Sequence, residues 1–541
     1  MKNKKIIIIF SIVIAIFTIG IVYKTFQNDT FFNIAIGKDI LTNGIDMKEH
    51  FCWVNDDLDY CYSHWAFDII IYLIYYSFSF KGIYIFTIIL SILINITLFV
   101  LLSKRTKSPI ISFIITLITA YIVRPAFTAR SQIISFLCFI IEIYCIEEFI
   151  ETNKKRYAFA IFIQSLIVAN FHAATWPLVL VLFMPYVAPA CLNLLSQKNI
   201  YKYIIKKLNK KIQKLPKDSP KIELYQKDIN DYERLSNSPP SKFSNYKAIR
   251  KENYNFKNLI ILIIIVALSG LITPIHGTPY TYILKSMLGP SNFEHHASID
   301  YIDEMKPIVP AANLTFLVFS ILFIGFLAFV PSKLKTEHGF LVLGLSIMAL
   351  VSARYSYLLA FLGAYALSDI LTYTVNLLIS DDIEILENFA ATPLGIIVLL
   401  CFSILITTNN LLEQSHYDYV DKSDYPIEAV EYIKNNLEYD KIRIFNSYNN
   451  GSYLMLNNIP VFIDSRLDVY CSEFNDTDIF YDFINVSTGK IYYETIFTKY
   501  DFTHILISTK TPLYNYISND SNYNILHENE FYVLFERTLA N

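Results

Sequence analysis

Residues that could do chemistry stand directly beside apolar runs in this sequence. Asp29 follows the run "IIIIFSIVIAIFTIGIVY", and Glu49 and His50 lie further along the segment after it. Charge beside or within such runs is costly to bury, so it marks function or pairs with another charge. In a shared cavity, a carboxylate can act as a base towards an acceptor hydroxyl group, and arginines facing it can stabilise a phosphate leaving group.

Further polar residues interrupt or end the later apolar runs. They are Arg124 and Arg130 in "RPAFTARSQ", Asn170 and His172 in "ANFHAATW", His276 in "TPIHG", Glu304 in "DEMKP" and Arg354 in "SARYS". Taken alone, an arginine at a span end usually extends its charge to the lipid headgroups, and an interfacial histidine usually satisfies a local hydrogen bond. Convergence of six such turns on one side of a membrane favours a shared cavity instead.

The composition identifies the elements that must position these residues. The chain has 541 residues, of which 54% are hydrophobic and only 17% are charged. This excludes an ordinary soluble enzyme and indicates a multi-span membrane protein. We predict eleven membrane-spanning helices, at 5–23, 83–102, 109–123, 131–147, 157–171, 174–194, 258–274, 312–330, 338–353, 356–379 and 393–409.

Charge is segregated along the chain, and the segregation predicts the topology. Residues 198–257 carry a net charge of +10, and residues 410–541 carry −11. The positive-inside rule places the N-terminus and the Lys-rich loop 195–257 in the cytoplasm. The first loop, 24–82, and the acidic tail then lie outside the plasma membrane, as do all the polar residues above. Counting 66–80 as a further span would reverse this, so we predict that it lies in the outer interface.

The tail, 410–541, is predicted to form a compact α/β domain. "YPIEAVEYIKNNL" has the pattern of an amphipathic helix, and "KIRIFNSY", "IPVFID", "THILIS" and "FYVLFER" have the pattern of short strands. Helices alternating with such strands suggest a small open sheet. The fold class is therefore a polytopic α-helical membrane protein, 1–409, with a C-terminal soluble α/β domain. Loop 195–257 is expected to be a helical hairpin or partly disordered.

Two pairs of residues, one in the tail and one in the first loop, leave alternatives open. Asp464 and Arg466 in "FIDSR" fall on the same side of an extended chain. They either contact a carbohydrate or acceptor, or form an ion pair that fixes a strand-to-helix turn. Cys52 and Cys61 either form a small disulfide outside the cell or remain free thiols. Asp39 is expected to be solvated surface.

Several short motifs follow one another along the chain in a characteristic order. They are "DTFFNIAIGKDIL" and "GIDMKEHF" in the first loop, "ARSQIISF" with Arg130 and Gln132, "VANFHAATW" with Asn170 and His172, "TPIHG", "DEMKP" with Glu304 and Pro307, and "RIFNSYNNGSYLMLNNIPVFIDSRLDVY" in the tail. This order resembles the membrane glycosyltransferases of the type C superfamily (GT-C), and particularly a bacterial branch with an extracytoplasmic C-terminal domain. The sequence departs from the branch's pattern at Ser131, Ala173, Thr273 and Met305.

The resemblance implies a GT-C-like fold and transfer of a hexosyl or pentosyl group at the extracytoplasmic face. The donor would be a polyprenyl-phosphate-linked sugar, and the acceptor a glycan, lipid or protein of the cell envelope. The resemblance gives the catalytic role to Asp29, with Glu49 as second carboxylate. It assigns donor-phosphate or substrate binding to Arg130, Gln132, Asn170, His172, Glu304 and Arg354. Some members need a divalent metal, so Mg²⁺ or Mn²⁺ is a candidate cofactor.

Two other function classes remain open on the sequence. A transporter or flippase for an envelope glycolipid would need a polar path through the bilayer, whereas these polar residues gather at one side. A non-catalytic envelope assembly protein would use its tail to bind a partner or a glycan. No glycine-rich phosphate loop follows any predicted strand, so nucleotide binding is unsupported, and nothing in the sequence suggests nucleic acid as a partner.

Overall fold

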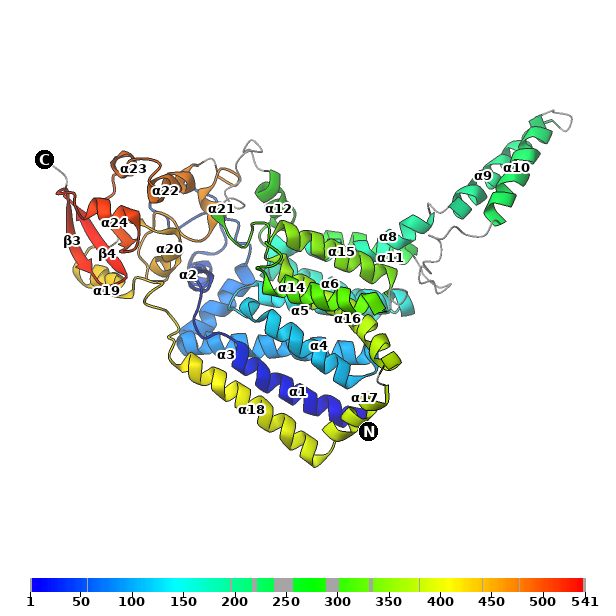
Figure 1. The fold of residues 1–541 in the computed structure, drawn as a ribbon. Helices are drawn as coiled ribbons and strands as arrows, with labels where there is room; N and C mark the ends of the chain where they lie inside the picture. Colours follow the sequence, from blue (N-terminus) through cyan, green and yellow to red (C-terminus); the bar gives the residue numbers. More distant parts are fainter. Residues whose placement is uncertain are drawn as a thin grey trace.

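The computed structural model describes residues 2–55, 57–194, 197–216, 221–237, 256–288, 301–329, 334–378, 380–439, 441–475 and 477–538. A bundle of roughly aligned helices carries the tail at one end, and the N-terminus lies at the other (Figure 1). Helix α2 (Asn28–Asn43) lies at the junction between the bundle and the tail.

The bundle contains the predicted apolar runs. Its main helices are α1 (Lys2–Ile21), α3 (Trp65–Thr106), α4 (Pro109–Ile122), α5 (Gln132–Thr152), α6 (Lys155–Phe171), α11 (Phe256–Ser269), α14 (Leu314–Phe329), α15 (Thr336–Val351), α16 (Tyr355–Leu378) and α18 (Pro393–Ser415). The predicted span at 174–194 is broken into η2 (Ala173–Thr175), α7 (Pro177–Val181) and α8 (Met184–Leu194). Shorter helices connect the bundle, namely η1 (Arg124–Ala126), α12 (Thr278–Leu288) and α17 (Ser380–Ala390).

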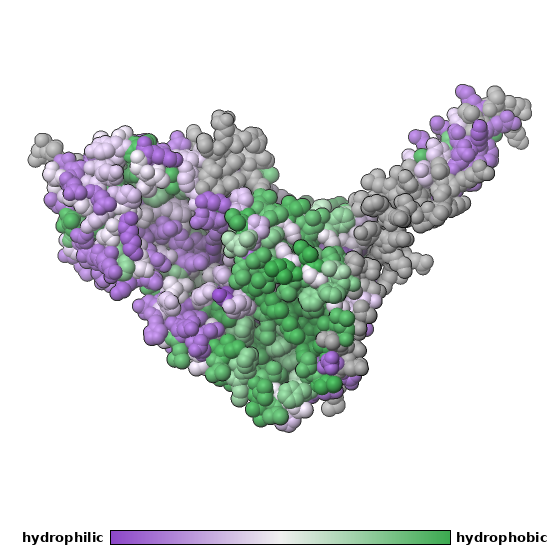
Figure 2. Space-filling model, in the orientation of Figure 1, coloured by the Kyte–Doolittle hydropathy of each residue, from purple (hydrophilic) through white to green (hydrophobic). Residues whose placement is uncertain are grey.

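Four of the helices described by the structure are long and apolar enough to cross a membrane. They are Lys4–Ile21, Trp65–Thr106, Tyr355–Val375 and Pro393–Ser415. Five further apolar helices are shorter. Apolar side chains cover the bundle in Figure 2, and hydrophilic ones cover much of the tail. The chain is therefore helix-rich with candidate membrane spans, while the count of eleven stays a prediction.

The first loop begins with α2, which packs closely against the start of α3. A Cβ atom at Gly37 would lie 2.0 Å from the carbonyl oxygen of Asp68, so only glycine permits this approach.

Ser79 (φ 55°, ψ −161°) interrupts α3 and separates its first turns from the long apolar part. The rings of Tyr76 and Phe78 before this kink are exposed, as expected for a segment at a membrane interface. The interfacial position of 66–80 stays a prediction.

The tail contains a four-stranded mixed sheet in the order β1-β2-β4-β3. The strands are β1 (Ile444–Asn446), β2 (His504–Ser508), β3 (Tyr523–Glu528) and β4 (Tyr532–Arg537). β1 is parallel to β2, and β4 is antiparallel to both β2 and β3. The helices are α19 (Ile427–Asn436), α20 (Tyr448–Leu456), α21 (Leu467–Tyr470), α22 (Ile479–Ser487), α23 (Tyr493–Tyr500) and α24 (Pro512–Ile517). The predicted helix and three of the four predicted strands are confirmed, whereas β3 was not predicted.

The fourth predicted strand, "IPVFID", is wrong as a member of the sheet. Val461 instead pairs with the first loop: its N–H donates to the Phe51 carbonyl (2.9 Å), and its carbonyl accepts from Trp53 N–H (3.1 Å). The side chain of Asn446 bonds the other side of the segment, because its amide donates to the Ile463 carbonyl at 2.6 Å. The segment is thus strand-like in its apolar pattern but is bonded to chain remote in sequence.

The first loop and the tail share one hydrophobic core. Buried side chains of the loop pack in the same cluster as the buried residues of the sheet and its helices. The loop contributes Phe32, Ala35, Ile36, Ile40, Cys52, Leu58, Tyr60 and Tyr62. The predicted division at 409/410 therefore separates two segments that are packed together.

The Lys-rich loop contains α9 (Gln197–Ile212) and α10 (Lys221–Asn237), which form a hairpin that projects from the bundle (Figure 1). The expected helical hairpin is confirmed for these residues. Residues 217–220 and 238–255 of the same predicted loop lie outside the described residues.

Candidate functional site

A cavity of 420 Å³ lies where the helix ends of the bundle meet the tail. It brings together seven of the ten site residues predicted from the sequence. Its wall includes Asp29, Arg130, Gln132, His172, Glu304, Arg354 and Arg466. The predicted convergence of polar turns on one cavity is present for the turns that carry these residues, whereas the turn with His276 contributes none to the described wall.

Arg130 is the centre of the charged cluster in this cavity. Its Nη2 lies 2.5 Å from Oδ2 of Asp29, and its Nη1 lies 2.8 Å from Oε1 of Glu304. Arg354 approaches the second oxygen of Glu304, with Nη2 3.9 Å from Oε2. The two carboxylates are thus held on either side of one guanidinium group, with a second arginine beside them.

Backbone contacts fix the elements that carry these side chains. Asp29 is the second residue of α2, and the hydroxyl of Thr30 donates to the carbonyl of Ala129, next to Arg130, at 3.3 Å. Glu304 lies in the segment before α14, and its carbonyl accepts from Arg354 N–H at 3.1 Å and from the Ser352 hydroxyl at 2.9 Å. The turn between α15 and α16 therefore positions both Arg354 and Glu304.

The environment distinguishes the two carboxylates. Burial raises the pKa of Asp29 above its ordinary value, and the charge of Arg130 opposes that rise without cancelling it. Burial also acts on Glu304, but Arg130 and Arg354 together hold its pKa below the ordinary value. Because the group with the higher pKa binds a proton more tightly, Asp29 is the better proton acceptor of the pair.

Two histidines lie in the same wall, and one of them was missed in the sequence. His64 precedes α3 and lies with its ring centre 5.2 Å from that of His172. Nδ1 of His172 is 2.9 Å from the hydroxyl of Ser135. Burial, together with the charges of Arg130 and Arg354, lowers the pKa of His64 to about 3. Both rings are therefore neutral near pH 7, since burial also lowers the pKa of His172. The available signal for His64 was its place beside an apolar run, which it precedes and which Asp29 instead follows.

A third carboxylate of the cavity wall was also missed. Asp468 follows Arg466 by two residues and lies in α21. Burial raises the pKa of Asp468 to about 6, against the charge of Arg466. The sequence carries it in "FIDSRLDVY", but nothing local distinguishes it from the other acidic residues of the tail.

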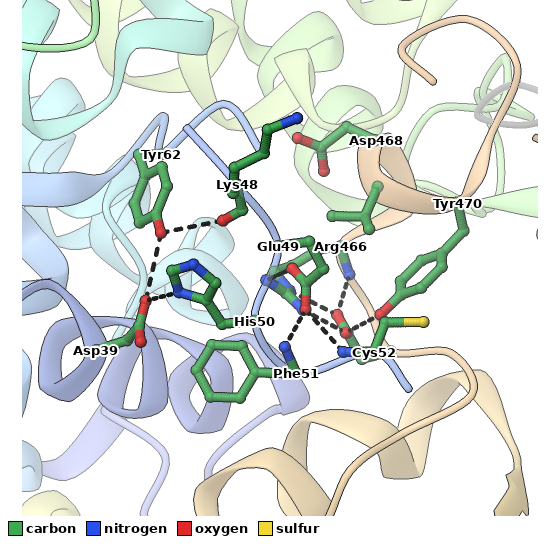
Figure 3. A network of polar contacts seen from close by, with 12 residues as sticks. Asp39, Lys48, Glu49, His50, Phe51, Cys52, Tyr62, Arg466, Asp468 and Tyr470 are labelled. Carbon is green, nitrogen blue, oxygen red and sulfur yellow. Dashed lines mark hydrogen bonds and ion pairs between the residues drawn. The ribbon is translucent and has the colours of Figure 1, made fainter. Parts of the chain in front are cut away.

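Arg466 binds both Glu49 and Asp464, and Figure 3 shows Glu49 beside Arg466. The two guanidinium Nη atoms of Arg466 donate to the Glu49 carboxylate at 2.6 and 2.9 Å, and its Nε donates to Oδ1 of Asp464 at 2.9 Å. Glu49 Oε1 also accepts from the backbone N–H groups of Phe51 and Cys52. The ion-pair interpretation of Asp464 and Arg466 is confirmed. Glu49 is absent from the described cavity wall, so this geometry gives no support to its predicted catalytic role.

The other residues singled out in the sequence lie outside the wall of this cavity. The amide of Asn170 donates to the carbonyls of Leu166 (2.8 Å) and Ile272 (3.0 Å), and therefore fixes the turn after α11. The expectation that Asp39 is solvated surface is wrong. Asp39 is 9% exposed, and its Oδ2 lies 2.9 Å from Nδ1 of His50 (Figure 3). His276 is exposed.

Cys52 and Cys61 are free thiols, which is one of the two alternatives that the sequence left open. The Sγ atom of Cys52 is 3.6 Å from the carbonyl oxygen of Phe462 in the tail. Cys52 is therefore one more contact between the first loop and the tail.

A second, larger cavity of 1540 Å³ adjoins the first. The two cavities have five wall residues in common, namely Asn28, Arg130, Glu304, Tyr448 and Asn449. The ion pair of Arg130 and Glu304 therefore stands between two spaces, one on the side of α12 and one on the side of α1, α4 and α18.

The implied divalent metal finds no matching set of ligands here. The described residues include no group of three or more His, Cys, Asp or Glu side chains that could hold a metal ion. Asp29 and Glu304, the two carboxylates that face each other, are both bound to Arg130. In the described part of the cavity, the guanidinium cation occupies the position between the carboxylates.

Two solved structures share this fold. Both are of an oligosaccharyltransferase from Archaeoglobus fulgidus, one in the apo form and one, named AglB, in complex with an inhibitory peptide and a dolichol-phosphate. Each aligns with a TM-score of 0.54 and 10% identity, over 93% of this chain and 69% of the archaeal chain. No family model and no curated protein matches the sequence. The alignment shows a fold shared with these oligosaccharyltransferase structures and leaves the bacterial branch untested.

Proposed function

We propose that this chain transfers a sugar from a lipid-phosphate-linked donor to a cell-envelope acceptor at the extracytoplasmic face of the membrane. The observation that carries the proposal is Arg130, bound to Asp29 and Glu304 where two cavities meet. A two-substrate transfer needs such a meeting point. The dolichol-phosphate bound to the archaeal enzyme is consistent with a lipid-linked donor.

The charged cluster suits displacement at the anomeric carbon of the donor sugar. The acceptor hydroxyl oxygen forms a bond to that carbon while the bond from the carbon to the phosphate oxygen breaks. The hydroxyl proton passes to Asp29, whose Oδ2 is bound to Arg130, so Oδ1 is the oxygen that accepts it. The phosphate leaves with the bonding electron pair, and Arg354 and Arg130 stabilise its charge.

In this proposal, the arginines of the cluster take the role that a divalent metal has in some members of the superfamily that the sequence resembles. Arg130 orients both carboxylates, and Arg354 contacts only Glu304 and the Met305 sulfur among its described side-chain contacts. Its guanidinium group therefore keeps donors for a phosphate. Glu304, with its lowered pKa, stays ionised and holds the two arginines in place.

Replacement of Asp29 by asparagine tests the proposal. Transfer from a polyprenyl-phosphate sugar should fall by about 100-fold or more in Asp29→Asn, because the proton acceptor is removed while the shape is kept. Asp59→Asn is the matched control, since Asp59 is an exposed carboxylate of the same loop that pairs only with Lys48 among the described ion pairs. Undiminished transfer by a normally inserted Asp29→Asn protein would refute the assignment.

One observation favours the transporter alternative. Glu142 lies midway along α5, is 1% exposed, and neither of its carboxylate oxygens has a hydrogen-bond partner among the described residues. Acidic residues buried midway along a membrane helix often line the path of a transported substrate or ion. A Glu142→Gln variant separates the two functions. Loss of glycolipid movement across vesicles with unchanged sugar transfer would establish transport as an activity of the bundle.

The assembly-protein alternative is tested through the tail. Removal of 415–541 takes away Tyr448, Arg466 and Asp468 from the cavity wall. The glycosyltransferase proposal therefore expects transfer to be lost along with any partner binding. A truncated protein that still transfers sugar would count against both the assembly role and the site as described.

A further inference from the structure

The larger cavity has dimensions unlike those of a small-molecule pocket. Its volume of 1540 Å³ exceeds the roughly 300–1,000 Å³ typical of sites for drug-sized ligands. The smaller cavity, at 420 Å³, falls in that range. Under the proposed function, the two spaces receive different substrates, so the larger one is suited to a chain rather than to a single sugar.

Exposed tyrosine rings line the larger cavity. Tyr23, Tyr121 and Tyr417 are 45%, 48% and 55% exposed, and they come from the ends of three membrane helices, α1, α4 and α18. A tyrosine combines a large apolar face with a polar hydroxyl tip. Sugar rings have the matching character, with apolar C–H faces and hydroxyl groups at the rim.

Arg124 adds a cation that no carboxylate neutralises among the contacts described for it. Its guanidinium carbon lies 4.2 Å from the centre of the Tyr121 ring, and its Nε donates to the Tyr23 hydroxyl at 3.1 Å. Two tyrosines thus hold the planar group at the cavity wall. Its remaining N–H groups can donate to two neighbouring hydroxyl or carboxylate oxygens of a ligand.

Amide side chains complete the polar part of this wall. Gln27, Asn410 and Asn449 line it, and an amide both donates and accepts, as a sugar hydroxyl does. Asn449 lies in the wall common to both cavities, where its carbonyl oxygen accepts from the Asn28 amide at 3.3 Å. Its NH₂ group remains a donor for a ligand.

An extended peptide would find less to bind in this cavity. Peptides that bind by strand addition need a free strand edge. The cavity reaches the sheet at Ser508 and Tyr532, and these two residues already pair with each other across β2 and β4. The described lining therefore offers rings, amides and charged groups, with Lys24 and Arg124 as cations and Glu413 and Asp424 as carboxylates, rather than an open backbone ladder.

We infer that the larger cavity is an acceptor site and that the acceptor is a glycan chain. This rests on the proposed function for the reaction, but the binding itself does not depend on it. The chain stacks on Tyr23, Tyr121 and Tyr417, is anchored by Arg124, and presents its terminal hydroxyl past Asn449 to Asp29. The donor then occupies the smaller cavity beside Arg354.

Direct binding without donor tests the inference. The full chain in detergent is mixed with fluorescently labelled oligosaccharides of increasing length, prepared by partial hydrolysis of the producing cell's envelope glycan. The same assay is run with peptides from that cell's secreted proteins. The glycans should bind, with affinity that rises with length, and the peptides should not.

Variants locate the binding site. Tyr417→Ala and Arg124→Gln should each lower glycan affinity by roughly tenfold, the change expected from losing one stacking or charged contact. Tyr516→Ala should leave affinity unchanged, because Tyr516 is a comparably exposed tyrosine of α24 outside both cavities. Peptide binding in place of glycan binding, or glycan binding that ignores Tyr417 and Arg124, would overturn the inference.

The experiments distinguish failure of the catalytic assignment from failure of the glycan-binding inference. If Asp29→Asn keeps full transfer while the glycans bind at Tyr417 and Arg124, the catalytic assignment is lost and the binding site stands. If transfer requires Asp29 but goes to a peptide, the glycan acceptor is lost and the catalytic assignment stands.

Discussion

Glu49 and Arg466 are 417 positions apart in the sequence, yet they form a doubly hydrogen-bonded ion pair with side chains 0% and 1% exposed. Asp464 completes the network on the other side of the guanidinium group. Breaking a buried pair leaves an uncompensated charge, which costs far more than the net contribution of the intact pair. This contact therefore holds the first loop against the tail directly behind the cavity.

Replacement of Arg466 by methionine should destabilise the protein strongly. Two carboxylates are left buried and unpaired in Arg466→Met, and the expected loss in free energy of unfolding is about 3–5 kcal/mol. Thermal unfolding of the purified protein measures it. Arg443→Met is the matched control, because Arg443 pairs with Asp501 at the exposed surface, where ion pairs contribute little. Equal midpoints for the two variants would contradict the structural role of the network.

Replacement of Arg130 by lysine should impair transfer without unfolding the chain. A lysine presents a single ammonium group and cannot bind Asp29 and Glu304 in the two-pronged geometry of arginine. We expect kcat to fall by about 100- to 1,000-fold, the usual effect of removing one preorganised charge donor. Arg156→Lys at the exposed start of α6 is the control. Full activity in Arg130→Lys would show that the bridged geometry is unnecessary.

The His50 contacts predict a pH-dependent stability of the first loop. Partial burial lowers the pKa of His50, but the hydrogen bonds and charges of Asp39 and Asp46 outweigh it and raise the pKa above 6.5. A histidine with a raised pKa stabilises the fold fully below about pH 6.5, and this contribution is lost as the pH rises through the folded-state pKa. The midpoint difference between wild type and His50→Gln should therefore be largest in mildly acidic buffer and vanish in alkaline buffer.

Exposed His276, which has no carboxylate partner among the described contacts, supplies the control His276→Gln. Both variants are measured over the same pH series. A His50→Gln difference that grows with pH would reverse the assigned sign.

Replacement of Gly37 by alanine should displace α2 and with it Asp29. The added methyl group would lie 2.0 Å from the Asp68 carbonyl oxygen, so the helix must move away from α3. Overpacking of this kind costs about 1–3 kcal/mol, and a shift of the base lowers kcat as well. Gly344→Ala in α15 is the control, because nothing lies within 4 Å of its Cβ position. Unchanged kcat in Gly37→Ala would show that α2 tolerates displacement.

The sequence predicted the charged cluster because that prediction depends on topology alone. Arg130 and Arg354 lie in turns between predicted spans, and Glu304 lies in the loop before one. The predicted topology puts all three on the same side, so the membrane pattern brings them together before any packing detail is known. The location of Glu49 depended on a partner 417 positions away, which a local pattern cannot identify. The partners of Asp39, His50 and Tyr62, are only 11 and 23 positions away, but their contact depends on how the first loop folds back on itself. The same reason explains "IPVFID", whose apolar alternation is real but whose bonding partner is the first loop.

His64 and Asp468 were missed for a related reason. Each is an ordinary polar residue in sequence, and only enclosure by other elements places it in the cavity wall. Burial and the neighbouring charges shift their pKa values, and neither can be read from spacing. Prediction from sequence therefore reached most of the bundle side of the site and, from the tail, Arg466 without Asp468.

The junction of the first loop with the tail also sets an order for biosynthesis. The loop leaves the ribosome early, but Arg466 and Val461, which pin it, follow more than 400 residues later. At about 5–20 residues per second, the loop waits tens of seconds for its partner. During that interval the cavity lacks one wall, so the site becomes complete only when synthesis of the chain is nearly finished.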